Sequence, residues 1–357
     1  MTYKVIQVGA GGFGKQWCTS FLPANVKDGL IEVVAAVDLN PDALQNAKSG
    51  LGLRDDQCYA DIKKAFAETK ADFCTIVVPP AFHEQVVDLA LQHDMHILSE
   101  KPIADTLEGS IRIVEKVRSA GKKMGVTMSH RFAQDKTTLR HELQSGRHGR
   151  LDYLMCRFTV DCRRFGSWGK FRHEIPDTLM VEGAVHHLDI LADLTGYVCD
   201  TIYAQTWNPP WGEFAGDSQG LVHMTMTNGT KAVYEGAKSN AVTLNGWSNE
   251  YIRAECEHST LIMSHKEIEK YAYGGGGQAE QIPLLQQNKW GHAWLIEQFV
   301  EWLDGGPPMA TNVEDNLQSV ALIFAAIESS RTGSPVKVQE MLERARSAVS
   351  TNWTPGR

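Results

Sequence analysis

Short apolar runs alternate with helical patterns over about the first third of the chain. The runs are Tyr3–Val8, Ile31–Val37, Phe73–Val78 and His96–Ser99, and Lys123–Thr127 closes the set. They are nearly continuous in apolar residues, which is typical of strands that are covered on both faces. Such strands, separated by helices, indicate βαβ units wound into a parallel sheet.

Local signals mark where the intervening helices begin and end. Asn40-Pro41 begins a helix over 42–48, because proline is tolerated in the first turn, where its missing N–H costs nothing. Asp105-Thr106 begins a second helix that runs through Ser119. Gly121 then supplies a left-handed cap.

The pattern changes after Thr127. A helix over 135–145 is followed by alternating strands at 151–160, 201–207, 220–227 and 231–235. Alternation of this kind predicts a mostly antiparallel sheet with one exposed face. The predicted fold is therefore α/β, with a doubly wound parallel Rossmann sheet in a first domain (1–127) and a large, mostly antiparallel open sheet in a second α/β domain (128–357).

The last third of the chain carries a glycine-rich segment and two helical patterns. Residues 273–278 include four consecutive glycines, which predict a mobile loop, with an active-site lid as the alternative. Trp290–Leu303 and Asn312–Thr332 have apolar residues at helical spacing. We expect these two helices to close the chain, and they could pack back on the first domain.

Composition narrows the functional classes. A chain of 357 residues with 43% apolar and 22% charged residues fits two globular domains. A net charge of −8 without a basic run argues against nucleic-acid binding. The apolar runs are shorter than the roughly 20 residues that cross a bilayer. No export signal precedes the first strand, and seven scattered cysteines read as reduced thiols, so we expect a cytoplasmic protein.

A glycine-rich turn follows the first strand directly and opens a helical segment, 15–21. Its sequence is Gly9-Ala10-Gly11-Gly12-Phe13-Gly14, which fits the dinucleotide pattern G-x-G-x-x-G. In this context a pyrophosphate can lie at a helix N-terminus. We expect Gly9 to permit the tight turn, Gly11 the close approach of the cofactor and Gly14 the helix packing.

Asp38 ends the second strand, about where an acidic residue is expected to bind the ribose hydroxyls. Its charge would repel a 2′-phosphate, and the following Leu39 and Asn40 offer no arginine to receive one. NAD is therefore favoured over NADP. The alternative is that Asp38 is a helix-capping carboxylate before Pro41.

Two later strands end in polar residues at the same edge of the parallel sheet, where ligands bind. Pro79 and His83 follow one strand, and His83 could touch the nicotinamide, or could be a helix-start residue with no role. Glu100 and Lys101 follow the next, and Pro102 biases Lys101 away from helix. The ammonium could polarise a hydroxyl or carbonyl, or lie in a solvated loop.

Taken together, the chain resembles the glucose-fructose oxidoreductase, inositol dehydrogenase and MocA (Gfo/Idh/MocA) family over nearly its whole length. Several short segments carry the resemblance, and the ending Ser329-Ser330-Arg331-Thr332-Gly333 is also similar. The segments are the turn Gly9–Gly14, Pro79 with His83, the stretch 90–102 that ends in Glu-Lys-Pro, Ser145-Gly146 with Gly149, and Glu182-Gly183-Ala184-Val185-His186-His187-Leu188-Asp189.

The resemblance implies a Rossmann domain followed by a domain whose open sheet carries the substrate and often forms a homo-oligomer, a dimer or tetramer. Cofactor contacts are implied for Gly9, Gly11, Gly12, Phe13, Gly14, Asp38, Pro79, His83, Glu100 and Lys101. The family's lysine corresponds to Lys101, its catalytic histidine to His186 and an acidic partner to Glu182, where many relatives have aspartate.

If the segment around His186 is helical, Glu182 and His186 lie four apart and share one face. The carboxylate could then orient the imidazole or stabilise its charged form, while His187 points elsewhere. Without the resemblance, the histidine pair would be read as structural, and Asp189 as bonding a nearby backbone group.

Other polar residues are candidates for substrate binding near the expected entrance. Each could bind a sugar hydroxyl or a carboxylate, but a surface ion pair or a packed aromatic ring is an equal explanation. Two adjacent arginines hint at an acidic substrate. These candidates are Arg131, Arg163, Arg164, Trp168, Arg172, His173 and His187, with His130 beside the first.

The expected reaction is reversible oxidation of a secondary hydroxyl on a sugar, sugar acid or cyclitol. His186 would accept the hydroxyl proton, Lys101 would hold the oxygen and Glu182 would tune His186. No metal is required. The alternatives are a redox-neutral enzyme that uses NAD, either an oxidoisomerase of a sugar acid with Mg²⁺ or an NAD-dependent glycosidase, and a non-catalytic NAD-binding sensor.

Overall fold

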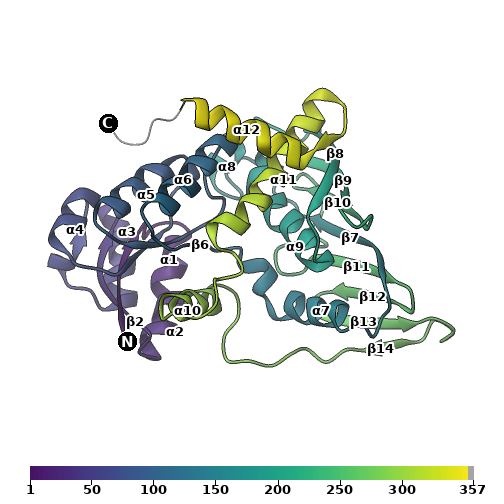
Figure 1. The fold of residues 1–357 in the computed structure, drawn as a ribbon, viewed down its shortest axis with the longest axis horizontal. Coiled ribbons are helices and arrows are strands. Elements are labelled where there is room, and N and C mark those ends of the chain that lie inside the picture. The colour runs from purple at the N-terminus through teal and green to yellow at the C-terminus, as the bar shows by residue number, and fades with distance from the viewer. Residues whose placement is uncertain (353–357) are drawn as a thin grey trace. The chain divides into compact units, whose positions relative to one another are not determined.

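The computed structural model describes residues 1–352 and is drawn in Figure 1. The chain forms two compact units. Among the described residues, unit 1 contains 1–132, 288–317 and 348–352, and unit 2 contains 133–287 and 318–347. Unit 1 thus includes residues 288–317, which carry the first of the helices expected near the end of the chain.

Unit 1 is built on a six-stranded sheet in which every paired strand is parallel. The strand order is β3-β2-β1-β4-β5-β6, so the direction of winding reverses between β1 and β4. Ligands of such sheets bind at this switch point, beyond the carboxyl ends of the strands. The strands are β1 (Tyr3–Val8), β2 (Ile31–Val37), β3 (Cys58–Tyr59), β4 (Phe73–Ile76), β5 (His96–Ser99) and β6 (Met124–Val126).

Helices of unit 1 begin and end where their capping residues predict. Asn40 accepts the Asp42 amide at 3.0 Å at the start of α3, and Thr106 accepts the Gly109 amide at 3.1 Å at the start of α6. Gly121, with φ of +63°, follows α6. The helices are α1 (Gly14–Gln16), α2 (Leu22–Lys27), α3 (Pro41–Leu51), α4 (Ile62–Glu68), α5 (His83–Gln92), α6 (Leu107–Ser119) and α10 (Gly291–Leu303).

The helix after the first strand differs from the expected one. Residues 15–21 were expected as a single helix, but α1 passes into the π-helix η1 (Trp17–Phe21), which continues into α2. Pro23 lies in α2 directly after the π-helix and has no N–H to donate to the turn before it. The continuation fits because Trp17 and Leu22 are fully buried in the core of unit 1 with Phe299 of α10.

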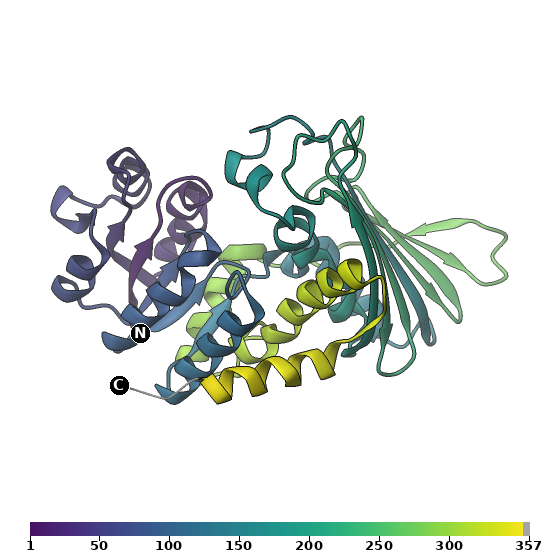
Figure 2. The ribbon, with the colours of Figure 1, turned by 90° about the horizontal axis from the view of Figure 1, so that it is seen from above.

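Unit 2 contains a nine-stranded sheet in the order β14-β13-β12-β11-β7-β10-β9-β8-β15. Only β7 and β10 pair in parallel, which confirms a mostly antiparallel sheet (Figure 2). The strands are β7 (Leu151–Thr159), β8 (Cys199–Trp207), β9 (Gln219–Met226), β10 (Lys231–Ala237), β11 (Tyr251–Cys256), β12 (Ser259–Ser264), β13 (Glu267–Ala272), β14 (Ala279–Gln281) and β15 (Val336–Lys337).

One face of this sheet is covered by helices and the other keeps exposed side chains. On β9, Val222 and Met224 are buried, while Leu221 and His223, which alternate with them, are exposed. The helix α9 contacts β7 and β10 on the covered face. The helices after unit 1's sheet are α7 (Gln134–Gln144), α8 (Lys170–Glu174), the π-helix η5 (Leu179–Ala184), α9 (Val185–Thr195), α11 (Val313–Thr332) and α12 (Val338–Asn352).

The expectation that two helices close the chain was wrong. A third, α12, follows α11 after the two-residue strand β15. Val338, Leu342 and Val349 are buried on one face of α12, and charged residues occupy the other. Those charges lower the mean hydropathy of the segment, and only a short connection separates it from α11. A search for apolar runs therefore does not detect this helix.

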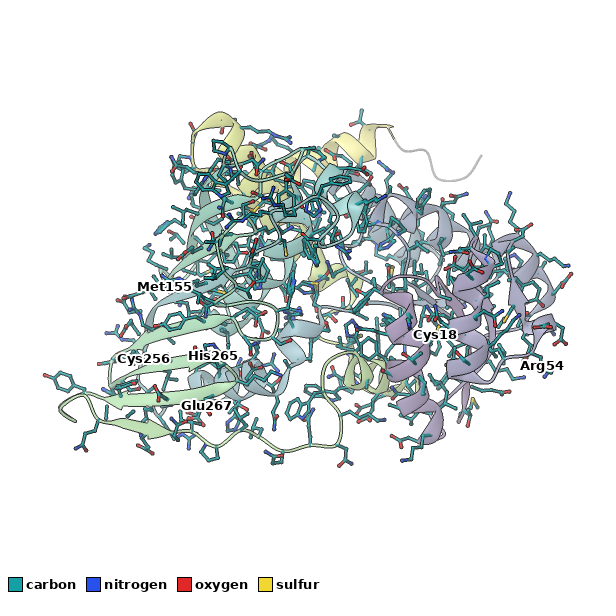
Figure 3. All side chains as sticks on the ribbon, turned by 180° about the vertical axis from the view of Figure 1, so that it is seen from behind. Cys18, Arg54, Met155, Cys256, His265 and Glu267 are labelled. Atoms are coloured by element: carbon teal, nitrogen blue, oxygen red, sulfur yellow. The ribbon has the colours of Figure 1, made fainter. Side chains whose placement is uncertain are left out.

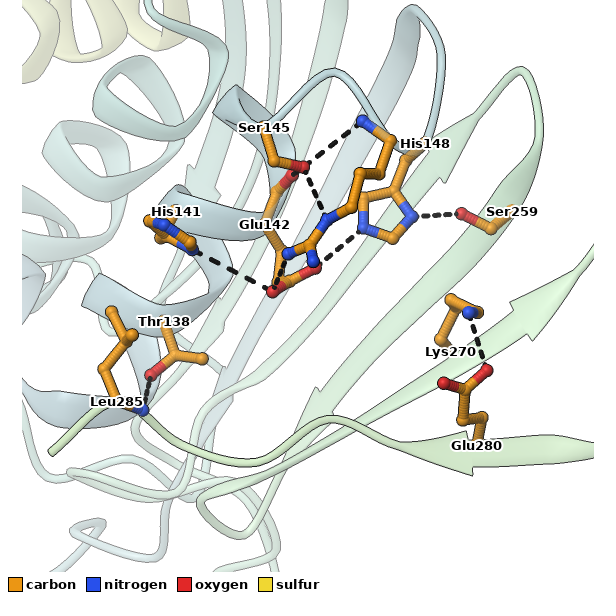
Figure 4. Close-up of polar contacts among 10 residues, drawn as sticks. Thr138, His141, Glu142, Ser145, His148, Ser259, Lys270, Glu280 and Leu285 are labelled. Carbon is orange, nitrogen blue, oxygen red and sulfur yellow. Dashed lines mark hydrogen bonds and ion pairs between the residues drawn. The ribbon is translucent and has the colours of Figure 1, made fainter.

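A polar cluster links α7 to the neighbouring strands of unit 2 (Figure 4). His148 is buried, with Nε2 3.0 Å from Glu142 Oε2 and Nδ1 2.7 Å from the Ser259 hydroxyl. Thr138 accepts the amide of Leu285 at 3.1 Å. A serine, a histidine and a glutamate also form hydrolase triads, but Ser259 is buried at the start of β12 and inaccessible to a substrate. The cluster therefore fastens α7 to the sheet.

The glycine-rich segment joins β13 to β14. Gly274, Gly276 and Gly277 have positive φ, which only glycine adopts without strain, and Tyr273 is 90% exposed. A loop was expected here, and its mobility stays a prediction. All seven cysteines are free thiols, including Cys18 on η1 and Cys256 at the end of β11, both labelled in Figure 3.

Candidate functional site

The glycine turn of unit 1 lies at the switch point of the parallel sheet, where close packing excludes side chains. A Cβ on Gly9, whose φ is +91°, would lie 2.0 Å from the Val77 carbonyl oxygen. A Cβ on Gly14 would lie 2.3 Å from the Gly9 oxygen. Gly9 and Gly14 therefore let the turn, the first helix and β4 pack together, as the spacing predicts.

Asp38 holds the turn from the end of β2. Its Oδ2 accepts the amides of Ala10 and Gly11 at 2.8 and 3.0 Å, and its Oδ1 accepts the Asn40 amide at 2.8 Å. A carboxylate offers about four lone-pair sites, so capacity remains for a further donor such as a hydroxyl. Asp38 and Asn40 both precede α3, and Asn40 is the residue that caps this helix.

His83 is fully buried at the start of α5. Its Nδ1 lies 3.0 Å from the Pro102 oxygen and 3.2 Å from the Ile103 oxygen, and its Nε2 lies 2.9 Å from the Val78 oxygen. Burial lowers the pKa of His83, although those carbonyls favour the charged form. The ring thus joins the loop after β4 to the loop after β5, and a nicotinamide contact stays a prediction.

Glu100 follows β5 and carries a buried carboxylate. Its Oε1 accepts the Trp17 indole N–H and contacts His292 Nε2, both at 2.9 Å. Its Oε2 accepts the amide of Lys101 at 3.3 Å. Burial alone would raise the pKa of Glu100, but His292, Lys101 and Trp17 together hold that pKa below its ordinary value. Glu100 is therefore an anion that anchors the backbone of Lys101.

Lys101 is half-buried and leads into a cis peptide bond with Pro102. It lies directly beyond the carboxyl end of β5, the edge of the sheet where ligands bind. Pro79, on the neighbouring loop after β4, begins a short 3-10 turn over Pro80–Phe82. Unit 1 thus brings the turn, Asp38, Pro79 and Lys101 to one edge of its sheet.

In unit 2, the segment with Glu182 and His186 is helical but not uniformly α. Glu182 lies in the π-helix η5, and His186 lies in the first turn of α9. A π turn has i→i+5 bonds and is found frequently at functional sites. Both side chains are buried, and Glu182 Oε2 accepts the Arg172 Nε at 3.0 Å. Whether Glu182 tunes His186 stays a prediction.

His187 points into the interior of unit 2. Its Nδ1 lies 3.0 Å from the Tyr234 hydroxyl, and its Nε2 lies 3.5 Å from Glu250. Glu250 also pairs with Lys136 at 2.7 Å. Burial alone would lower the pKa of Lys136, but Glu250 and Asp135 raise it. His187 therefore belongs to a buried ionic network beneath α9, and a role in substrate binding stays a prediction.

Aromatic rings and cations gather beside the His186 helix. The Trp247 ring lies edge-on to His186 at 6.0 Å and 5.5 Å from Trp168. The Lys238 ammonium lies 4.0 Å from the centre of the Trp168 ring, and the Arg172 guanidinium lies 4.9 Å from it. Lys238 is fully buried, so the two cations and the tryptophan rings pack against one another beside this helix.

The remaining substrate candidates already have partners within their own unit. Arg163 contacts Asp161 at 3.2 Å, and Arg164 pairs with Glu213 at 2.6 Å. His173 is buried and stacks on Phe214 at 4.1 Å. In unit 1, half-buried Arg131 lies over the ring of its neighbour Phe132, and half-buried His130 precedes it.

Sequence reasoning missed several residues around these sites. Trp17 and His292 hold Glu100, although they are far from it in the chain. Lys238 donates to the Thr178 oxygen at 2.6 Å, beneath the Trp168 ring. Each of these residues lies in an apolar segment whose pattern predicts only core packing. Their polar partners could therefore be identified only from the fold.

Unit 1 has the geometry of a dinucleotide-binding oxidoreductase: six parallel strands, a glycine turn at the switch point and an acid at the end of β2. The sequence comparisons agree. Residues 3–128 match the family model "Oxidoreductase family, NAD-binding Rossmann fold", and residues 140–338 match "Oxidoreductase family, C-terminal alpha/beta domain". The chain belongs to the Gfo/Idh/MocA family of oxidoreductases, which confirms the resemblance and the predicted fold.

Individual relatives cover nearly the whole chain. The uncharacterized protein y4oX of Sinorhizobium fredii is 54% identical over 98% of this chain and 99% of its own length. The D-glucoside 3-dehydrogenase of Escherichia coli is 25% identical over 86% of this chain and 90% of its own length.

A solved structure shows the same fold. It is an oxidoreductase from Agrobacterium radiobacter in complex with NAD⁺, L-tartaric acid and magnesium. Its TM-score is 0.84 at 19% identity, with 96% of this chain and 100% of that chain covered. Among residues 1–352, no helix is long and apolar enough to cross a membrane.

Proposed function

We propose that this oxidoreductase uses NAD to oxidise, reversibly, a secondary hydroxyl on a sugar, sugar acid or cyclitol. The observation that carries the proposal is the half-buried Lys101 beyond β5, with its backbone anchored by a buried carboxylate at the ligand-binding edge of the sheet. The name of the Escherichia coli relative, a dehydrogenase acting at a glucoside hydroxyl, supports the reaction class.

The residues present fit NAD. A Cβ on Gly11 would lie 3.3 Å from Ala43 and 3.6 Å from Asp38, in the space where a pyrophosphate passes close to the backbone. Asp38 would accept a ribose hydroxyl with its remaining lone pairs. The same charge repels a 2′-phosphate, and the following Leu39 is 89% exposed and apolar. We therefore infer that NAD is preferred over NADP.

The nicotinamide, when bound, accepts or returns a hydride at the substrate carbon. The protein's part is to hold the hydroxyl and move one proton. We assign Lys101 to holding and polarising the hydroxyl oxygen and His186 to accepting its proton as general base. In the reverse direction His186 returns that proton. Glu182, already paired with Arg172, would bias the charge of His186.

The contacts in unit 2 refine the substrate class. Arg163 and Arg164 are each neutralised by a carboxylate of the same unit, so neither is needed as a receptor for an acidic substrate. Trp168 and Trp247 are half-buried in the cluster beside the His186 helix, and their accessible parts would suit contact with the apolar face of a sugar or cyclitol ring. We propose that neutral polyols and sugars bind at least as well as sugar acids.

A panel of polyols, aldoses and aldonates tests the reaction directly. Each compound is incubated with the enzyme and NAD while absorbance is followed at 340 nm, and products are analysed in parallel, with and without Mg²⁺. Growth of NADH absorbance with at least one compound supports the dehydrogenase. Product without NADH would favour a redox-neutral oxidoisomerase or glycosidase, and no product across a broad panel would favour a sensor.

We also place this enzyme in the cytoplasm as a homo-oligomer. The seven cysteines are free thiols, as expected for a reducing compartment. The uncovered face of the nine-stranded sheet carries exposed Leu221 and Trp207, which suits association.

A further inference from the structure

A single buried carboxylate in unit 1 is bonded from three directions. Glu100 is 7% exposed and interacts with Trp17, His292 and the amide of Lys101. A buried carboxylate is costly unless its oxygens are paired and hydrogen-bonded. Because its pKa is held below the ordinary value, Glu100 keeps its charge. Loss of any one of these hydrogen-bond donors would therefore cost free energy.

His292 is the donor that comes from farthest along the chain. It lies in the first turn of α10, and its ring stacks on Phe21 with centroids 4.3 Å apart and planes 11° from parallel. The ring also lies 5.3 Å from Phe13, inside the glycine turn, and 5.5 Å from Trp17. These aromatic contacts fix the imidazole so that Nε2 faces the carboxylate.

The network connects the two parts of unit 1 that the proposed reaction uses. On one side, His292 packs against Phe13 of the cofactor turn. On the other, its partner Glu100 bonds the backbone of Lys101. Loss of the imidazole donor would leave the buried carboxylate short of a partner, and Glu100 would turn or take up a proton. The anchor on the Lys101 amide would weaken in either case.

We propose that His292 is a positioning residue for Lys101 and acts through Glu100. The proposal rests on the role given to Lys101 in the proposed function. In this role His292 acts on Lys101 through Glu100 and needs no contact with the substrate or the reacting atoms. It keeps the ammonium of Lys101 at one place at the edge of the sheet, and a displacement of about 1 Å there can lower turnover about 100-fold.

The test compares two substitutions at position 292. His292→Phe keeps the aromatic stack on Phe21 and removes the donor, whereas His292→Gln keeps a donor that can reach Glu100. We expect His292→Phe to lower kcat about 10- to 100-fold with the Kd for NADH, from its fluorescence, within about threefold of wild type. His292→Gln should restore kcat to within about threefold of wild type.

Asn25→Leu is the matched control for helix docking. Asn25 is buried and donates to the Ala293 oxygen on the same turn of α10, but it does not contact Glu100. We expect this variant to lose thermal stability comparable to His292→Phe and to keep kcat. Equal loss of kcat in the two variants would show that His292 only docks α10 and would overturn the proposal.

Chemical labelling of Lys101 separates this proposal from the proposed function. Trinitrobenzenesulfonate is applied to the protein without cofactor, and modification of the Lys101 peptide is timed by mass spectrometry. His292→Phe should change the labelling rate at least threefold, while His292→Gln and Asn25→Leu leave it near wild type. The labelling rate can be measured even if no substrate is turned over. The positioning role of His292 and the proposed function can therefore be disproved independently.

Glu100→Gln covers the case in which His292→Phe does not fold. It preserves the shape of the side chain and removes the charge that orients His292 and Trp17. We expect the same change in Lys101 labelling and the same fall in kcat. Wild-type labelling and wild-type kcat in both His292→Phe and Glu100→Gln would overturn the proposal.

Discussion

At the scale of single residues, the proposed choice of NAD over NADP depends on a few atoms at the end of β2. Asp38 uses both oxygens to hold the backbone of the glycine turn and the start of the next loop. These bonds fix the carboxylate beside the glycine turn. We propose that the same carboxylate also binds the ribose and selects NAD.

Replacement of Asp38 by alanine should weaken NADH binding about tenfold or more, because hydrogen bonds to a charged group contribute about 1.5–3 kcal/mol. Loss of the charge should also reduce the difference between the Kd for NADH and the Kd for NADPH. Fluorescence titration with both cofactors measures the two Kd values. Asp61→Ala is the control, since Asp61 also accepts a backbone amide, at the start of α4, but does not bond the glycine turn. Unchanged NADH affinity in Asp38→Ala would contradict the assignment.

Residues with a fixed spacing could be predicted from the sequence, and residues with a distant partner could not. Gly9, Gly14 and Asp38 follow a motif, and the structure gives each a packing or bonding reason. The surroundings of Glu100 depend instead on Trp17 and His292, which the fold brings from elsewhere in the chain. No local pattern encodes that pairing.

At the scale of elements, five of the six strands of the parallel sheet were predicted to within two residues at each end, because burial on both faces gives continuous apolar runs, and the two-residue strand β3 was missed. The strands β11 to β14 were missed. They alternate charged and apolar residues, as in Glu267–Ala272, and short turns separate them. The π turns η1 and η5 were missed as well, since an extra residue in a helical turn leaves little trace in apolar spacing.

The helices α5 and α6 are joined by an ion-pair cluster with a predictable pH dependence. Glu84 bonds Arg112 at 2.7 and 2.8 Å and Lys116 at 3.0 Å. The Arg112 guanidinium, aided by Lys116, holds the pKa of Glu84 below its ordinary value of 4.5. The folded state thus binds this proton less readily than the unfolded state. The stabilisation is complete above that ordinary value and is lost as pH falls through the lower folded pKa.

We therefore expect Glu84→Gln to lower the free energy of unfolding by about 1 kcal/mol at pH 7. The difference from wild type should shrink as the pH is lowered below about 4. Urea unfolding at a series of pH values measures it. Glu68→Gln, on the exposed surface of α4, should have little effect at any pH. A penalty for Glu84→Gln that grows in acid would refute this reading of the cluster.

At the scale of the whole molecule, the uncovered face of the nine-stranded sheet bears on assembly. Leu221 and Trp207 are 47% and 43% exposed on adjacent strands of this face. Open sheet faces with exposed apolar residues are suited to association with a second copy. A dimer or tetramer is therefore the state we predict.

Sedimentation velocity tests the predicted assembly. The wild-type protein should sediment as a dimer or tetramer, and Leu221→Lys should shift it toward the monomer because a charge would be buried in the interface. Val26→Lys, at an apolar position of α2 that is 42% exposed, serves as the control and should not change the assembly. A wild-type protein that sediments as a monomer would contradict the predicted dimer or tetramer.

The central claim is that Lys101 and His186 perform the proton chemistry of an NAD-dependent oxidation. The most direct measurement is turnover, followed at 340 nm with the best substrate of the panel, for Lys101→Ala and His186→Ala. The account predicts that both variants fold and bind NADH, and that kcat falls about 100- to 10,000-fold. Variants that fold, bind NADH and retain full turnover would contradict it.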